Sequence, residues 1–370
     1  SKFAKPCLRQ LRKIVFEDAL INYYQEESQE IDTVLDIFIR TNSGGEPLSF
    51  SNLLMSITTA YWETDARNEF DTLIKEIHSK NFIISADLIL KCWLVIYGND
   101  IKFQVSNFTP QSVKDFEGEW KRIRKCFVVT FDLLHKWGFN DSSLKAKNAV
   151  IPIVYYIYDH ELEESILKDN IHHEERAAMR KWLCISLLKG VFGGQSDTVL
   201  TGIRAVLKEN KVNNIFPFEQ IKEKFAKNDA KSLSLSDEVI EDILKTQKGT
   251  SNSYALLSLL YSHLHYDTVK YHEDHLHPAS KFMNLQQGNM KDDEYAFYKN
   301  PEHWNSILNL QLLSSSTNES KNDEDLVTWI KNLNDIRDSR VNIMEKFNRV
   351  NPTTNIENFS LMDIRRKYND

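Results

Sequence analysis

The sequence combines long stretches of helically spaced apolar residues with few residues that force turns. Its 370 residues include only 11 glycines and 8 prolines, the two residue types that most often mark turns. Apolar residues recur at intervals of three and four over much of the chain, and this spacing places them on one face of an α-helix. We therefore expect a mainly helical protein rather than a turn-rich β architecture.

Local end signals divide the helical pattern into segments. Asp65 and Ser85 stand where a capping side chain is needed, Pro152 suits a first turn, and Gly138 suits a helix end. The expected helices cover residues 7–24, 52–61, two segments between 62 and 97, 110–137, 148–159, 174–190, 198–210, a run that opens at 217–218, 238–247, 254–263, 325–330, 336–347 and 359–368.

Composition is typical of a globular protein, with 41% hydrophobic and 27% charged residues. The length suits two or three domains. A net charge of −7 is not that of a strong nucleic-acid binder, although a local basic stripe would be enough. One candidate stripe is on the 110–137 helix, where a solvated face is the alternative to DNA backbone contact; it consists of Lys121, Arg122, Arg124 and Lys125.

Cysteine usage and hydropathy predict a cytoplasmic protein without a membrane partner. No apolar run is long enough to cross a bilayer, and the N-terminal basic residues precede no secretory signal. The cysteines lack metal-binding spacing and lie in apolar sequence, which predicts reduced core thiols. They are Cys7, Cys92, Cys126 and Cys184.

The chemically richest stretch is residues 271–278, Tyr-His-Glu-Asp-His-Leu-His-Pro. It contains a D-H-x-x-P pattern beginning at Asp274, followed by N-L-x-x-L from Asn309 and N-x-x-K from Asn318. A hard divalent ion prefers oxygen ligands and stabilises the charge that develops in phosphodiester hydrolysis. A neutral imidazole suits general-base work because its pKa lies near neutral pH.

The order and spacing of these three patterns resemble the HNH nuclease signature, also called the ββα-metal finger. The resemblance implies that Asp274 and Asn318 bind a divalent metal, with Mg²⁺ expected and Mn²⁺ able to substitute. It also implies that His275 deprotonates the attacking water and that Asn309 holds the loop of this base by hydrogen bonds. Lys321 is placed to meet a phosphate.

Neighbouring strand residues point to opposite faces of a sheet. Asp274 and His275 therefore cannot both face one ion from a regular strand, and Pro278 suits a break. We expect an irregular loop that turns both side chains to one spot. A regular strand with the side chains of Asp274 and His275 on opposite faces would contradict this hypothesis.

The neighbouring histidines allow other interpretations. His272 is a further candidate metal ligand, although both His272 and His277 can instead be structural. A zinc site is the alternative that uses most histidines, but structural zinc sites usually include cysteine and none is near. Its ligands would be His263, His265, His272 and His277.

A second resemblance lies near the N-terminus. Residues 37–54, IFIRTNSGGEPLSFSNLL, are similar to the F-x-R-x-N-x-G-G-x-x-L-S segment of the GmrSD family. This family comprises modification-dependent restriction and phage-defence proteins with a ParB-like nucleotide-hydrolysing part followed by an HNH part. The two resemblances occur in the family's order, which implies DNA, including modified or phage DNA, as the partner.

The family's D-G-Q-Q-R motif, which carries its nucleotide chemistry, does not occur in these 370 residues. We expect it to lie upstream, to belong to a separate NTP-binding polypeptide, or to have been lost, and we do not predict NTP hydrolysis. Arg40, Asn42 and Gly45 are candidates for half of a nucleotide- or DNA-sensing site. A glycine-rich turn before a helix can hold an anion, but a plain loop is the alternative.

Together these patterns predict an α+β, predominantly α-helical protein with a C-terminal ββα-metal (HNH) module. The expected divisions are a ParB-like remnant (1–60), a helical domain (61–248), the nuclease module (249–325) and C-terminal helices (326–370). The expected function is metal-dependent DNA endonuclease in a defence system. One alternative is a DNA- or nucleotide-sensing module whose nuclease half is degenerate or partner-dependent, and another is a helical interaction protein with structural zinc.

Overall fold

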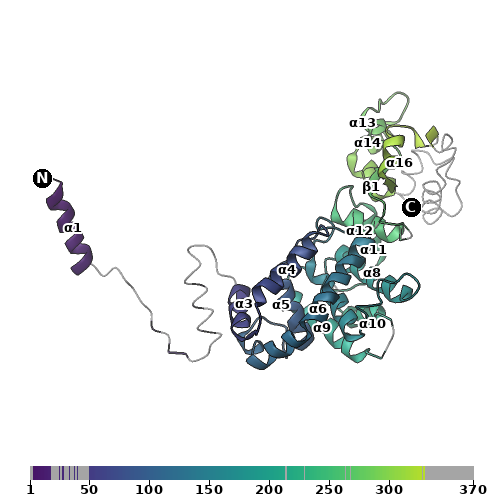
Figure 1. Ribbon diagram of the computed structural model, residues 1–370. Coiled ribbons are helices and arrows are strands. Elements are labelled where there is room, and N and C mark those ends of the chain that lie inside the picture. The colour runs from purple at the N-terminus through teal and green to yellow at the C-terminus, as the bar shows by residue number, and fades with distance from the viewer. Residues whose placement is uncertain are drawn as a thin grey trace.

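The computed structural model describes residues 3–17, 25, 27, 28, 33, 37, 40 and 50–329, apart from 213, 214, 229, 263, 267 and 327. Helices dominate this part of the chain, and one antiparallel pair of strands accompanies them (Figure 1). The predicted class, α+β and mainly helical, is confirmed. Asn42 and Gly45 lie outside the described residues, and so does the expected C-terminal helical region beyond residue 329.

The helices from α3 to α12 form what we call the helical body. The bounds of its elements and of the N-terminal helix are α1 (Ala4–Phe16), α3 (Phe50–Tyr61), α4 (Ala66–His78), α5 (Ala86–Tyr97), η1 (Val105–Asn107), α6 (Pro110–Lys136), η2 (Lys147–Val150), α7 (Ile151–Asp159), α8 (His173–Leu188), α9 (Ser196–Glu209), α10 (Phe218–Phe225), α11 (Asp237–Leu244) and α12 (Ser251–Leu260).

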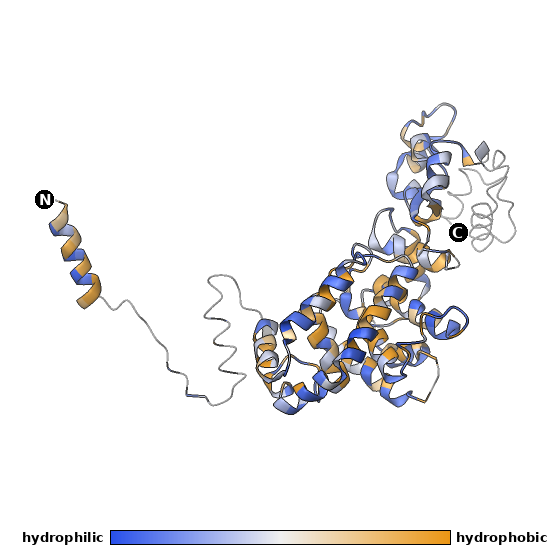
Figure 2. Cartoon of the chain, viewed as in Figure 1, coloured by the Kyte–Doolittle hydropathy of each residue, from blue (hydrophilic) through white to orange (hydrophobic). Residues whose placement is uncertain are grey.

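One hydrophobic core runs through the helical body. Its buried residues extend from Leu54 on α3 to Ala255 on α12, and α7 is buried from Ile151 through Ile157. Figure 2 shows hydrophobic residues gathered in the middle of the body and hydrophilic ones toward its outside. The periodic apolar residues of the sequence thus fill a shared interior, and α3 packs into the same core as the helices that follow it.

Most expected helix signals act as predicted. The Asp65 side chain accepts a hydrogen bond from the backbone N–H of Asn68 at 3.1 Å, and Gly138 takes φ +80° just after α6. Ser85 precedes α5 but makes no capping hydrogen bond. The expectation that all cysteines are core thiols is wrong for Cys7, which is exposed on α1, whereas the other three are buried.

The basic stripe on α6 is largely neutralised by neighbouring carboxylates. Arg122 pairs with Glu163, Arg124 with Glu76, and Lys125 with Glu164. These contacts match the interpretation of a solvated, ion-paired face. Within the described ranges, no helix has both the length and the apolar character needed to cross a membrane.

Residues 271–321 form a second unit, which we call the hairpin module. Strand β1 (Tyr271–His275) pairs with β2 (Leu310–Ser314), and α16 (Ser315–Lys321) follows directly. Between the strands lie α13 (Ala279–Met283), α14 (Asp292–Lys299), α15 (Pro301–Trp304) and η3 (Ile307–Asn309). The module adjoins the α11–α12 end of the helical body (Figure 1).

Leucines on both faces of β2 hold the hairpin in place. Leu310 and Leu312 pack with Tyr261 of the region after α12, while Leu313 packs with Leu276 and Trp304 inside the module. A strand with apolar residues on both faces is buried on both sides. The polar strand β1 is therefore fixed against a buried partner, and this fixes the directions of its side chains.

Candidate active site

Strand β1 is regular through both Asp274 and His275. Asp274 lies opposite Gln311 and His275 opposite Leu310 in the antiparallel register. The two side chains consequently point to opposite faces and have separate partners. The expected irregular loop at this pair is therefore wrong: the chain bends only after His275, because β2 extends far enough to pair with both residues.

Lys321 holds the carboxylate of Asp274. The lysine Nζ lies 2.9 Å from Asp274 Oδ2 and also donates to the carbonyl of His275 at 2.7 Å. Gln311 Nε2 donates to the same Oδ2 at 3.1 Å. The expectation that Lys321 meets a phosphate is wrong, because its side chain is only 1% exposed and is already bonded within the hairpin module.

His275 is placed as a buried, neutral imidazole. Its Nε2 lies 2.9 Å from Asn305 Oδ1, and its Nδ1 lies 3.5 Å from Lys248 Nζ. Burial lowers the pKa of His275, and the positive charges of Lys248 and Lys321 lower it further, against the opposing effects of Asn305 and Asp274. The ring is therefore unprotonated near neutral pH, as a general base must be.

Asn309 fixes the bend that follows His275. Its side chain accepts from the backbone N–H of His277 at 2.9 Å and donates to the carbonyls of His277 and Trp304 at 3.0 and 2.9 Å. The residue is completely buried. One amide thus satisfies three buried backbone groups, and each of these would be costly to leave unpaired.

His272 shares a strand face with Asp274, and Asn318 shares a helix face with Lys321. His272 is two residues before Asp274 and so shares its face, but its Nε2 contacts Ser315 Oγ at 3.0 Å. Asn318 is three residues before Lys321 on α16, which places both on one helix face. Its half-buried side chain makes no hydrogen bond within the part of the chain that the structure describes.

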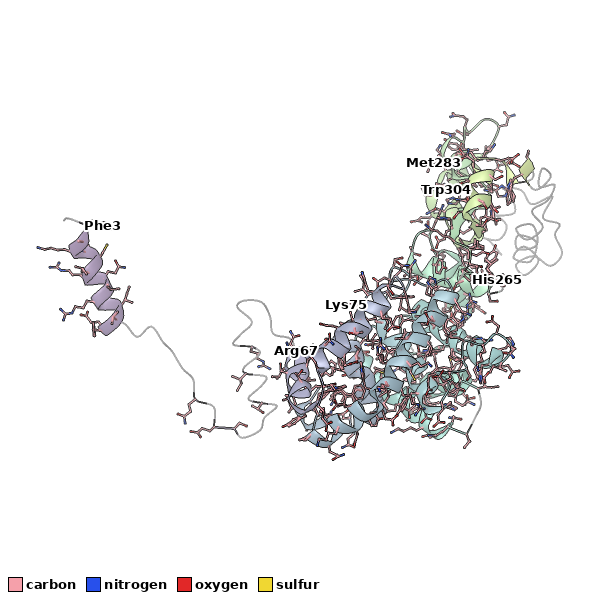
Figure 3. The ribbon with its side chains drawn as sticks, viewed as in Figure 1. Phe3, Arg67, Lys75, His265, Met283 and Trp304 are labelled. Carbon is pink, nitrogen blue, oxygen red and sulfur yellow. The ribbon has the colours of Figure 1, made fainter. Side chains whose placement is uncertain are left out.

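The oxygen donors near Asp274 suit a hard cation. Asp274 Oδ1 takes part in no hydrogen bond among the described residues, and the buried Gln311 Oε1 likewise has no partner there. Carboxylate and amide oxygens completed by water are the ligands that Mg²⁺ prefers. Within the described ranges no three His, Cys, Asp or Glu residues converge. Of the four histidines of the zinc alternative, His263 lies outside those ranges and His265 is exposed (Figure 3).

The segment before α12 contributes residues that the sequence patterns did not single out. Lys248 donates its backbone N–H to the Asn305 carbonyl at 2.9 Å, and Gly249 donates to Glu273 Oε2 at 2.7 Å. This short stretch therefore runs beside β1 and brings Lys248 to His275. No motif marks Lys248 or Asn305, since their proximity to His275 depends on contacts across 27 and 30 residues.

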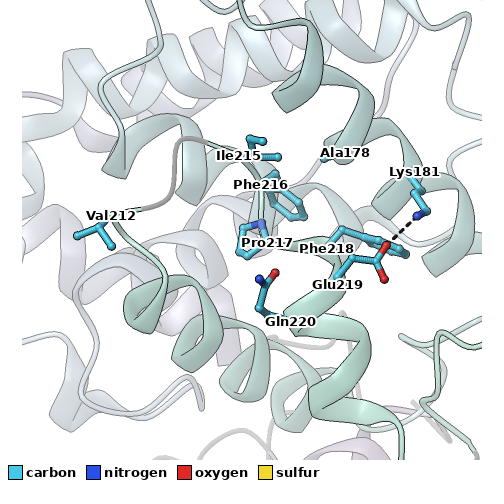
Figure 4. Close-up of a pocket in the computed structure, with 9 residues that line it drawn as sticks. All are labelled: Ala178, Lys181, Val212, Ile215, Phe216, Pro217, Phe218, Glu219 and Gln220. Atoms are coloured by element: carbon cyan, nitrogen blue, oxygen red, sulfur yellow. Dashed lines mark hydrogen bonds and ion pairs between the residues drawn. The ribbon is translucent and has the colours of Figure 1, made fainter.

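A cavity of about 530 Å³ lies elsewhere, between α8 and the connection that leads to α10 (Figure 4). Its basic side chain, Lys181, pairs with Glu219 at 2.8 Å and lies over the Phe218 ring. The charge is thus already balanced, and no residue of the hairpin module lines the cavity.

Of the three residues of the expected N-terminal site, the structure describes one. Arg40 is exposed, while Asn42 and Gly45 fall outside them. Comparison with protein-family models and with curated proteins finds no match for this chain. Functional assignment therefore depends on the geometry around His275 and Asp274.

Proposed function

We propose that the chain is a metal-dependent DNA endonuclease of the HNH type, acting in a GmrSD-like restriction or phage-defence system. The observation that carries this proposal is the β–β–α order of the hairpin module, with Asp274 and His275 at the end of its first strand and α16 packed beside them. The buried Asn309, which ties the bend after His275 to the start of β2, adds support.

In this proposal each polar group has a separate task. His275 takes a proton from the attacking water, and Asp274 with Asn318 holds a divalent ion. Lys321 keeps one oxygen of Asp274 in place and leaves Oδ1 for the ion. When bound, the ion would polarise the phosphoryl oxygen and stabilise the leaving oxyanion.

Lys248 replaces Lys321 as the residue proposed to meet the scissile phosphate. It is only partly buried, and its ammonium lies beside the ring nitrogen of His275. A lysine binds phosphate as a compact point charge on a flexible stem. Swinging from the imidazole to a phosphate would place its charge near the attacked atom while freeing Nδ1 for water.

A second candidate is a DNA-binding module that does not cut by itself. The splayed directions of Asp274 and His275 and the ion pair of Asp274 with Lys321 favour it. In this case the hairpin module would recognise DNA, and cleavage would need a partner that rearranges the strand end.

Nicking of supercoiled plasmid by the purified chain, with Mg²⁺ or Mn²⁺, tests the first proposal. We expect the wild-type chain to nick and His275→Ala to be inactive with an unchanged circular dichroism spectrum. His265→Ala is the matched control, because this histidine is exposed, and it should nick normally. Equal nicking by His275→Ala would exclude His275 as the base, whereas DNA binding without nicking in either metal would support the second candidate.

A further inference from the structure

We propose that Asn305, itself oriented by Gln247, is a positioning residue that fixes His275 as the Nε2–H tautomer and leaves Nδ1 to receive the proton. The catalytic meaning of this inference rests on the proposed nuclease function. The tautomer itself follows from the hydrogen bonds around the ring, and it can be measured whether or not the protein cleaves DNA. The hydrogen bonds run from Gln247 through Asn305 to the His275 ring.

The orientation of the Gln247 amide is set by two backbone carbonyls. Its Nε2 donates to the carbonyl of Lys245 at 2.8 Å and to that of Glu302 at 2.9 Å. A carbonyl only accepts, so the nitrogen must face both groups and Oε1 must face away. The backbone is held as well, because Gln247 forms an antiparallel bridge with Ser306.

The orientation of Gln247 determines that of Asn305. Asn305 Nδ2 donates to Gln247 Oε1 at 3.4 Å, and its Oδ1 therefore faces His275 Nε2 at 2.9 Å. An amide oxygen has no proton to give. The proton in the short contact consequently belongs to His275 Nε2.

The opposite side of the ring agrees with this assignment. Nδ1 of His275 faces Lys248 Nζ at 3.5 Å, and an ammonium only donates. The alternative tautomer would set an N–H against the ammonium of Lys248 and a lone pair against the oxygen of Asn305. Both contacts would be repulsive, and the contact with Asn305, at 2.9 Å, is much the shorter of the two. Lys248 favours the same tautomer but stands on a flexible stem that can move away, so Asn305 is the main determinant of the tautomer.

Asn305 would affect catalysis through His275 in two ways. It keeps the ring in one orientation, with Nδ1 on the Lys248 side. It also accepts a hydrogen bond that strengthens when the ring becomes positive after taking the proton, the support that a base-orienting group gives. A side chain that only fills space would do neither.

Selective ¹³C and ¹⁵N labelling of histidine in the full chain allows the tautomer to be read by NMR, with His275→Ala identifying the signal. We expect the Nε2–H form in the wild-type chain. Asn305→Ala should give a mixture of tautomers, while Asn305→Asp should keep the Nε2–H form. The exposed Asn284 offers a control, and Asn284→Ala should leave the signal unchanged.

Kinetics supply the second readout. Asn305→Ala should lower kcat about 10- to 100-fold with little change in KM, and Asn305→Asp should restore much of the rate. The tautomer measured by NMR is the readout that a purely structural role for Asn305 would not change.

Clear results would overturn the proposal. An Nδ1–H form in the wild-type chain would do so, and so would an unchanged tautomer in Asn305→Ala. If Asn305→Ala fails to fold, Gln247→Ala gives the same test one residue further from the ring. If the wild-type chain cuts no DNA, the nuclease proposal fails while the NMR experiment still decides the tautomer.

Discussion

Lys321, the last residue of α16, forms an ion pair with Asp274 on β1 at 2.9 Å, with only 1% of the lysine side chain exposed. The pair joins the first strand of the hairpin module to its helix, and a second bond from Lys321 reaches the His275 carbonyl. One buried ammonium therefore ties the two parts of the β–β–α unit together beside the candidate active site.

Breaking this pair from the lysine side should destabilise the hairpin module. We expect Lys321→Met to reduce the local free energy of unfolding by about 3 kcal/mol, because it leaves the Asp274 carboxylate without its partner. The double variant with Asp274→Asn should lose less than the two single changes added together. Hydrogen exchange of peptides from residues 271–321 measures this, and additive losses would show that the pair contributes no coupling.

Under the proposed nuclease function, the lowered pKa of His275 predicts the pH below which cleavage is lost. Burial and the nearby lysines lower that pKa from the ordinary 6.5, so the neutral base persists to lower pH than a free histidine. The acidic limb of kcat/KM should therefore have its midpoint below 6.5. A midpoint at or above 6.5 would contradict the buried, lysine-flanked ring.

The lowered pKa of His275 also makes the free energy of unfolding depend on pH. The unfolded chain takes up a proton on this histidine near pH 6.5, while the folded chain does so only at lower pH. Stability should thus fall as pH drops below 6.5 and level off beneath the folded-state pKa. The pH dependence of unfolding should be weaker in this range for His275→Ala than for the wild-type chain.

Lys248 should contribute more to DNA binding than Lys245, which lies three residues before it. In a His275→Ala background, in which the proposed function expects no cutting, Lys248→Ala should weaken DNA binding and reduce the slope of log affinity against log salt by about one. Lys245→Ala is the matched control, since Lys245 is exposed and lies 3.6 Å from Asp242. Equal effects of the two changes would count against a phosphate role for Lys248.

Gly138 and Gly190 allow the cost of backbone strain to be compared with the cost of a steric clash. Gly138 and Gly190 both have positive φ, but only at Gly138 would an added Cβ meet neighbours, lying 2.1 Å from Tyr254 Oη and 2.3 Å from Tyr266 Cδ1. Alanine at Gly190 should cost about 1–2 kcal/mol from backbone strain alone. Alanine at Gly138 should cost about 1–3 kcal/mol more, and thermal unfolding of both variants measures the difference.

Short-range patterns predicted the helices well, because helix periodicity and caps are local. The stripe through Phe70, Leu73 and Ile77 is buried, and Asp65 caps that helix as expected. Ser85 shows the limit of such signals: it stands in the right place, yet its side chain makes no capping bond. Sequence position alone does not settle the side-chain geometry.

Local sequence patterns were enough to predict the helical class, the order of the helices and the segments that contain Asp274, His275 and Asn309. The groups that surround these residues depend on how the whole chain packs. Register with β2 splays Asp274 and His275, burial commits Lys321 to Asp274 rather than to a ligand, and the segment before α12 delivers Lys248. These outcomes depend on contacts between residues 27 to 47 positions apart, and no local spacing encodes such contacts because packing of the whole chain selects them.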